Sequence, residues 1–259
     1  MKRLLLTIAF LSAAAAAACA MTAQWNTDES RHFVVFFRSA DARSVTAVAA
    51  KAEGYYAAIS RDLGLRARRL RGQRHERITI YLFDTRDQFQ ANTGEPAWAD
   101  ASSIQRLRVI YSFAGAKEFL VQALPHEIAH VLLKEAVGFD NRAVPAWFEE
   151  GFSSLYEEKD AASAAAAVGT SIADGSYLAL DRLSGLDIRG SNDAALLGRF
   201  YAQSSSIVRY LKAIDGGRKF RRLIRNMRSA ESFERALTAA YGFKGIEELE
   251  EHWKEYLNR

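Results

Sequence analysis

Residues 125–130 read Pro-His-Glu-Ile-Ala-His, and residues 147–152 read Trp-Phe-Glu-Glu-Gly-Phe. Positions i and i+4 of an α-helix lie on one face about one turn apart, so His126 and His130 can present two imidazole nitrogens to a single ion. Glu127 is offset around the helix from this pair, where its carboxylate can reach a water at the ion without being a ligand. The first stretch therefore indicates a zinc site with a general base.

The second stretch offers candidates for a third ligand. A catalytic zinc usually has three protein ligands and an open fourth position. A helical wheel places Glu149 and Glu150 on opposite flanks of an apolar arc, so periodicity alone does not choose between them. Gly151 costs about 1 kcal/mol against alanine inside a helix, and we expect it to permit the close approach of a second helix beside Glu150.

These two stretches resemble the gluzincin metallopeptidases, in particular the peptidase MA-like families and, more distantly, the aminopeptidase N catalytic domain. The family pattern is His-Glu-x-x-His followed by Trp-Leu-x-Glu-Gly-Phe-Ala, and residues 147–153 here read Trp-Phe-Glu-Glu-Gly-Phe-Ser. The match implies one catalytic Zn²⁺, with His126, His130 and Glu150 as its ligands and Glu127 as the general base. The spacing from His130 to Glu150 is one residue longer than in aminopeptidase N-like enzymes, which argues against close kinship with them.

The same families carry a tyrosine further along the chain, whose phenol stabilises the oxyanion. Tyr201 begins a similar stretch here, with Gln203 and Ser204 in place of the usual Lys-Gly. The resemblance therefore implies that Tyr201 is a catalytic residue.

Residues 106–113 are predicted to form a strand directly before the zinc-binding helix. Gluzincins place there the sheet-edge strand that pairs with an extended substrate. The aminopeptidases also have a Gly-Ala-Met-Glu-Asn motif in this region, whose glutamate binds the free amino end of the substrate. Residues 112–116 contain no carboxylate, so the resemblance implies an endopeptidase rather than an aminopeptidase.

Residues 1–20 have a basic start, an apolar run and a track of alanines, which is typical of a secretory signal peptide. The small residues around Cys19 predict cleavage before Met21 and hence an exported protein, periplasmic or secreted. The alternative is a lipoprotein anchored through Cys19, although a bacterial lipobox usually has leucine where Ala16 stands. The apolar run is too short for a confident membrane span, so we expect no integral span in the mature chain.

Composition narrows the function classes further. The formal net charge of +4 falls to +2 without Lys2 and Arg3, so no nucleic-acid partner is expected. Residues 61–77 contain seven arginines, which we interpret as a solvated connector. Structural zinc sites are usually closed by four ligands rich in cysteine, whereas the single cysteine here lies at position 19.

Periodicity predicts an α/β (α+β) fold, and the resemblance makes it a thermolysin-like zincin: a small N-terminal sheet with helices, the His-Glu-x-x-His helix and a helical C-terminal lobe. We expect one domain over 21–259, with a sheet-containing lobe at 21–137 and a mainly helical lobe at 138–259. Pro125 lies inside the zinc-helix pattern of 117–136 and predicts a kink or a fresh helix start. The predicted strands are 31–38, 77–84 and 106–113; the predicted helices include 41–63, 199–211, 218–227, 232–241 and 246–257; and 160–175 is expected to be a helix end and surface loop.

The function that we expect is zinc-dependent hydrolysis of peptide bonds in a peptide or protein substrate, in an exported compartment. The alternative is a non-catalytic zinc-binding envelope protein that uses the same scaffold for binding or assembly. The absence of a recognisable specificity motif keeps this alternative open.

Overall fold

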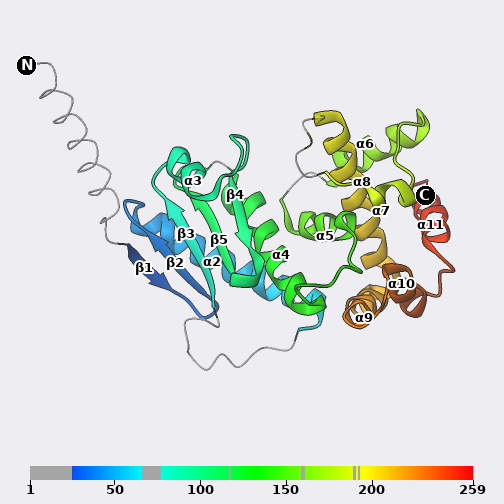
Figure 1. Cartoon of the computed structure of the whole chain (residues 1–259), viewed down its shortest axis with the longest axis horizontal. Helices are drawn as coiled ribbons and strands as arrows, with labels where there is room; N and C mark the ends of the chain where they lie inside the picture. The colour runs from blue at the N-terminus through cyan, green and yellow to red at the C-terminus, as the bar shows by residue number, and fades with distance from the viewer. Residues whose placement is uncertain are drawn as a thin grey trace, which may run out of the picture.

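The computed structural model describes residues 25–65, 77–116, 118–158, 161–188, 191 and 193–258. The predicted signal peptide and most of the arginine-rich stretch lie outside these residues. The described chain has a small N-terminal sheet at one end and helices over most of the remainder (Figure 1). The mixed α/β class predicted from the sequence is therefore confirmed.

Five strands form one mixed sheet in the order β1-β2-β3-β5-β4. The three inner strands are parallel, and the two edge strands run antiparallel to their neighbours. Inward-facing and outward-facing residues alternate along the first part of β3, as expected for a strand with two different faces. The strands are β1 (Asn26–Glu29), β2 (Phe33–Phe37), β3 (Ile78–Phe83), β4 (Ala101–Ile104) and β5 (Val109–Phe113).

The edge strand beside the helix that carries His126 and His130 is β4, which corrects the expectation from the sequence. The predicted strand at 106–113 is shorter, because residues Gln105–Leu107 form a 3-10 turn and Arg108 adopts a left-handed conformation with φ of 56°. What remains of it, β5, is an inner strand between β3 and β4. β4 is only four residues long and half of it is serine, so it carries no apolar alternation by which it could be predicted.

One face of the sheet packs on α2 (Ala42–Leu63) and α4 (Leu124–Val137). Side chains of β3 and β5, such as Ile80 and Ile110, are fully buried in the same cluster as Ile128 of α4. The opposite face carries a smaller cluster, in which Phe89 of α3 (Arg86–Thr93) contacts Phe113. The sheet therefore packs against α4 and fixes the position of this helix, which carries both histidines.

The start of α4 agrees with the prediction from Pro125. A π-helical turn at Phe119–Ala123 precedes α4, which begins at Leu124 with the proline in its first turn. Proline is tolerated there because the first backbone N–H groups of a helix have no partner within the helix. The helix that carries His126 and His130 therefore starts afresh at Leu124 rather than running continuously over 117–136.

The rest of the described chain is mainly helical. The predicted helices at 218–227, 232–241 and 246–257 are confirmed within a residue, while α8 begins five residues earlier than predicted because Asp193 caps it. The expectation of a helix end and surface loop at 160–175 is wrong, because the alanines there, the best helix formers, form the helix α6. The helices of this part are α5 (Ala146–Ser153), α6 (Ala161–Ala173), α7 (Leu180–Gly185), α8 (Ala194–Ala213), α9 (Arg218–Met227), α10 (Phe233–Tyr241) and α11 (Ile246–Leu257).

Helices α5 and α8 touch at Gly151, as expected from the glycine beside Glu150. A Cβ atom built on Gly151 would lie 2.3 Å from the backbone oxygen of Ser204 and 2.8 Å from Cγ2 of Val208. Only glycine permits this approach without displacing backbone. Across the described residues, no helix is both long and apolar enough to cross a membrane.

Candidate metal centre

The side chains of His126, His130 and Glu150 converge at the junction of α4 and α5. The Nε2 atoms of the two histidines lie 2.9 Å apart. The Oε2 atom of Glu150 lies 3.4 Å from Nε2 of His126 and 3.6 Å from Nε2 of His130. In the part of the chain that the structure describes, this is the group of histidine, cysteine and acidic residues with metal-binding geometry.

The donor set and its spacing fit a zinc ion. Zinc binds imidazole nitrogen and carboxylate oxygen at about 2.0–2.1 Å in a tetrahedral arrangement, which places neighbouring ligand atoms roughly 3.3 Å apart. The three separations scatter around that value. His126, His130 and Glu150 would therefore hold Zn²⁺ and leave a fourth position open.

The electrostatics of the cluster favour a cation. Burial alone would lower the pKa of both histidines, but hydrogen bonds and charges from the surrounding carboxylates outweigh it and raise both pKa values above the usual range. Burial likewise acts to raise the pKa of Glu150, yet the charges of His130 and His126 hold it far below its usual value. A carboxylate that stays charged, beside imidazoles that attract positive charge, favours the binding of a divalent ion.

Each histidine is oriented by a carboxylate on its other ring nitrogen. Nδ1 of His126 lies 2.7 Å from Oε1 of Glu157, whose side chain is only 6% exposed. Nδ1 of His130 lies 3.2 Å from Oε1 of Glu149, and Lys134 binds the other oxygen of Glu149 at 2.6 Å. Such partners fix the ring and direct Nε2 toward the ion.

The structure thereby separates the roles of the two glutamates that periodicity left equivalent. The apolar arc of α5 is fully buried, with Trp147, Phe148 and Phe152 at 0% exposure. Glu150 then faces both Nε2 atoms, whereas Glu149 faces Nδ1 of His130. Glu150 is the residue that the resemblance implied as the third ligand.

Two neighbours of the cluster were missed in the sequence, Glu157 and Ser103. Glu157 follows Glu150 after a 3-10 turn at Ser154–Tyr156, so helical spacing does not connect the two. Ser103 lies on β4, and its Oγ atom is 2.5 Å from Oε2 of Glu127. No pattern in the sequence links this serine to the helix 24 residues away.

Tyr201, on α8, lies within electrostatic reach of the cluster. Burial raises the pKa of its phenol above the usual value, and the negative charges of Glu150 and Glu157 raise it further. The phenol therefore stays protonated and able to donate a hydrogen bond. Tyr201 is 37% exposed, so the residue is not enclosed in the core.

The two residues that replace the family's Lys-Gly have structural roles. The Gln203 side chain is fully buried, where its Oε1 accepts from the backbone N–H of Leu178 at 2.7 Å and its Nε2 donates to the carbonyl of Leu178 at 2.9 Å. The backbone of Ser204 packs on Gly151. This departure from the family pattern fixes α8 against its neighbours, and Tyr201 lies about one turn before Ser204 along α8.

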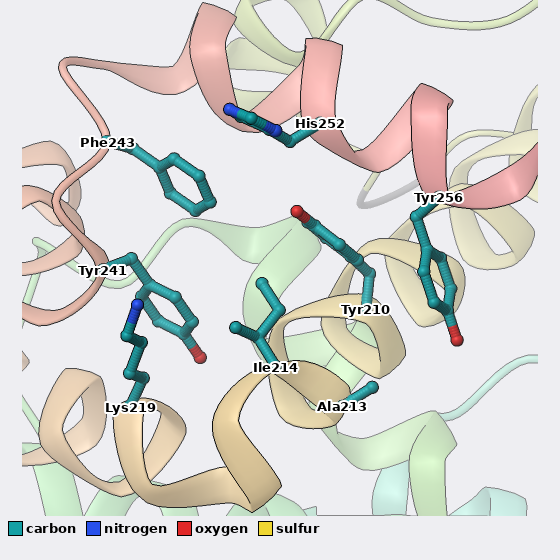
Figure 2. A pocket seen from close by; sticks show the side chains of 8 residues that line it. All are labelled: Tyr210, Ala213, Ile214, Lys219, Tyr241, Phe243, His252 and Tyr256. Atoms are coloured by element: carbon teal, nitrogen blue, oxygen red, sulfur yellow. The ribbon is translucent and has the colours of Figure 1, made fainter.

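A separate pocket of about 340 Å³ lies in the helical part, between the end of α8 and helices α9 to α11 (Figure 2). Aromatic side chains form much of its wall, and Lys219 and His252 also line it. Tyr210 points into this pocket, and the Tyr177 hydroxyl is bound by Glu250 and Lys254. Both tyrosines are therefore placed differently from Tyr201, whose phenol lies within electrostatic reach of the cluster. None of the predicted site residues lines the pocket.

The fold and the three-residue cluster are compatible with a zinc-binding protease. Residues 62–259 match the family model of the Peptidase MA superfamily. The chain belongs to this superfamily. Membership suggests hydrolysis of the metallopeptidase type, which implies a peptide or protein substrate. A comparison with curated proteins finds no match.

Proposed function

We propose that this chain is a zinc-dependent endopeptidase with a thermolysin-like arrangement of its active site. The observation that carries the proposal is the convergence of two Nε2 atoms and one carboxylate oxygen from His126, His130 and Glu150. A site with three such ligands and an open position is typical of catalytic rather than structural zinc.

The surrounding residues fit peptide-bond hydrolysis. When bound, Zn²⁺ acts as a Lewis acid that polarises the carbonyl and lowers the pKa of water from about 15.7 toward 7. Glu127, next to the first ligand in sequence, takes the proton of the attacking water and delivers it to the leaving amine. Tyr201, held protonated, donates a hydrogen bond to the oxygen that becomes negatively charged.

Two features near the site support endopeptidase action. Residues 112–116, at the end of β5, offer no carboxylate for a free amino end. β4 ends the sheet and runs beside α4, so an extended chain can add to its outer edge by main-chain hydrogen bonds. The mature protein would act in an exported compartment, periplasmic or secreted, in keeping with the predicted signal peptide.

Glu127→Gln tests this function. The variant keeps the size of the side chain and removes the base, so we expect bound zinc at the wild-type level and turnover lower by about 100- to 10,000-fold. Zinc is measured by elemental analysis and turnover by digestion of a peptide library followed by mass spectrometry. Equal cleavage by wild type and variant would refute the mechanism. Stoichiometric zinc in a wild-type protein that cleaves no denatured protein would instead favour the non-catalytic envelope role.

A further inference from the structure

Ser103 connects the edge strand of the sheet to the residue proposed as the general base. It lies in the middle of β4 and pairs with Ile110 of β5, whose side chain is fully buried on the face toward α4. Paired residues share a face of the sheet, so the side chain of Ser103 also points toward α4. Its Oγ atom reaches Oε2 of Glu127 at 2.5 Å.

The direction of this hydrogen bond is fixed by a second contact. The amide Nε2 of Gln105 donates to Oγ of Ser103 at 3.2 Å. A serine hydroxyl has one proton, and an amide Nε2 can only donate, so the hydroxyl proton is left for Oε2 of Glu127. Ser103 therefore accepts from Gln105 and donates its proton to Glu127, and a hydrogen bond to a charged group is stronger than one between neutral groups.

We propose that Ser103 is a positioning residue for Glu127, a role that rests on the proposed function. By holding Oε2, the serine restricts the torsions of a flexible glutamate side chain and leaves Oε1 to accept the proton of the reacting water. Gln105, at the 3-10 turn that follows β4, holds the serine hydroxyl in turn. The strand whose outer edge is available to substrate thus also sets the position of the base.

Ser103→Ala tests the proposal, with Ser102→Ala as its matched control. Ser102 is the preceding residue of the same strand, and its side chain points to the opposite face, because successive residues alternate. A hydrogen bond to a charged group corresponds to a factor of about 10 to 100, so Ser103→Ala should lower kcat by that amount. KM and zinc content should stay within about twofold, since the Ser103 hydroxyl is not a zinc ligand and the substitution leaves the main chain of β4, through which substrate would pair, unchanged.

Rescue by the conservative variant separates positioning from a general packing effect. Ser103→Thr restores the hydroxyl and should recover kcat to within about threefold of wild type, while Ser102→Ala should change it by less than about twofold. A Ser103→Ala enzyme with wild-type kcat would overturn the proposal. So would a threonine variant that stays as slow as the alanine variant.

A binding measurement keeps this test distinct from the test of hydrolysis. A small peptide hydroxamate that binds zinc sites needs a well-placed carboxylate to accept its proton, so its Kd should rise about 5-fold or more in Ser103→Ala and stay unchanged in Ser102→Ala. If the wild type binds zinc without turnover, this measurement still decides the role of Ser103, and an unchanged Kd would overturn it. If the wild type binds no zinc, the proposed function fails and the positioning role fails with it.

Discussion

Gly151→Ala should show that the contact of α5 with α8 places Glu150 against the two histidines. The added Cβ would lie 2.3 Å from the backbone oxygen of Ser204 and 2.6 Å from its carbonyl carbon. The obstacle is backbone, so no change of rotamer relieves it. Helix α5 would have to retreat by about 1 Å to restore a van der Waals contact, and Glu150, the next residue back, would move with it.

Two opposing effects set the change in the free energy of unfolding of Gly151→Ala. Alanine favours a helix interior over glycine by about 1 kcal/mol, whereas overpacking a well-packed contact costs about 1–3 kcal/mol, and more when backbone must move. We expect a net destabilisation of about 1–2 kcal/mol, which for a domain of this size lowers Tm by about 2–8 °C. Zinc affinity should fall at least about 10-fold, because a ligand displaced by 1 Å no longer meets the ion at bonding distance.

Gly198→Ala is the matched control for this measurement. Gly198 lies in α8 itself, and a Cβ built there meets no atom within 4 Å. This variant should gain the helix propensity alone, with Tm raised by up to about 4 °C and zinc affinity unchanged. Melting followed by circular dichroism and zinc titration against a fluorescent chelator compare the two. A Gly151→Ala protein that melts like the control and keeps wild-type zinc affinity would refute the reasoning.

Three further outcomes are expected. Glu150→Ala should be isolated with little zinc, while Glu149→Ala, which removes a partner of His130, should lose only about 10- to 100-fold in zinc affinity. Elemental analysis after dialysis distinguishes the two variants. The reverse order of zinc content would make Glu149 the ligand. Tyr201→Phe should lower kcat by about 100- to 1000-fold with unchanged zinc and KM, and a drop below about fivefold would show that the phenol is not the oxyanion donor. Burial acts to raise the pKa of Glu53, but hydrogen bonds from His32 and its neighbours outweigh burial and lower this pKa. The stability that the Glu53 carboxylate contributes is therefore present above the unfolded pKa of about 4.3 and is lost as pH falls through the folded pKa. Glu53→Gln should thus melt below wild type at pH 7 and approach it as pH falls through the folded pKa of Glu53, and a constant difference in Tm would contradict this.

The grouping of the two histidines on one face of α4 and the start of that helix could be predicted from the sequence alone. Each depends on contacts within one or two helical turns, where fixed geometry converts spacing into position. Pro125 marks a helix start for the same local reason, since it lacks a backbone N–H and adopts a fixed φ. The apolar arc around Trp147 and the glycine at 151 likewise predicted a buried face and a close helix contact, and both are present.

The choice between Glu149 and Glu150 was beyond periodicity, because both flank the same buried arc. The packing of α5 on α4 and α8 decides it: the rotation that buries Trp147 and seats Gly151 on Ser204 turns Glu150 toward both Nε2 atoms. The family pattern pointed to the same residue, but the physical cause is the docking of three helices.

Only the tertiary structure shows that β4, with Ser103, and Glu157 lie beside the helix that carries both histidines. Ser103 and Glu127 are 24 residues apart in sequence, and His126 and Glu157 are 31 apart, so no local spacing relates them. β4 is stabilised by pairing with β5, and three of its four residues, an alanine and two serines, have little strand propensity. Local periodicity thus determined which residues can bind a metal, while sheet order and helix docking determined which side chains hold them in place.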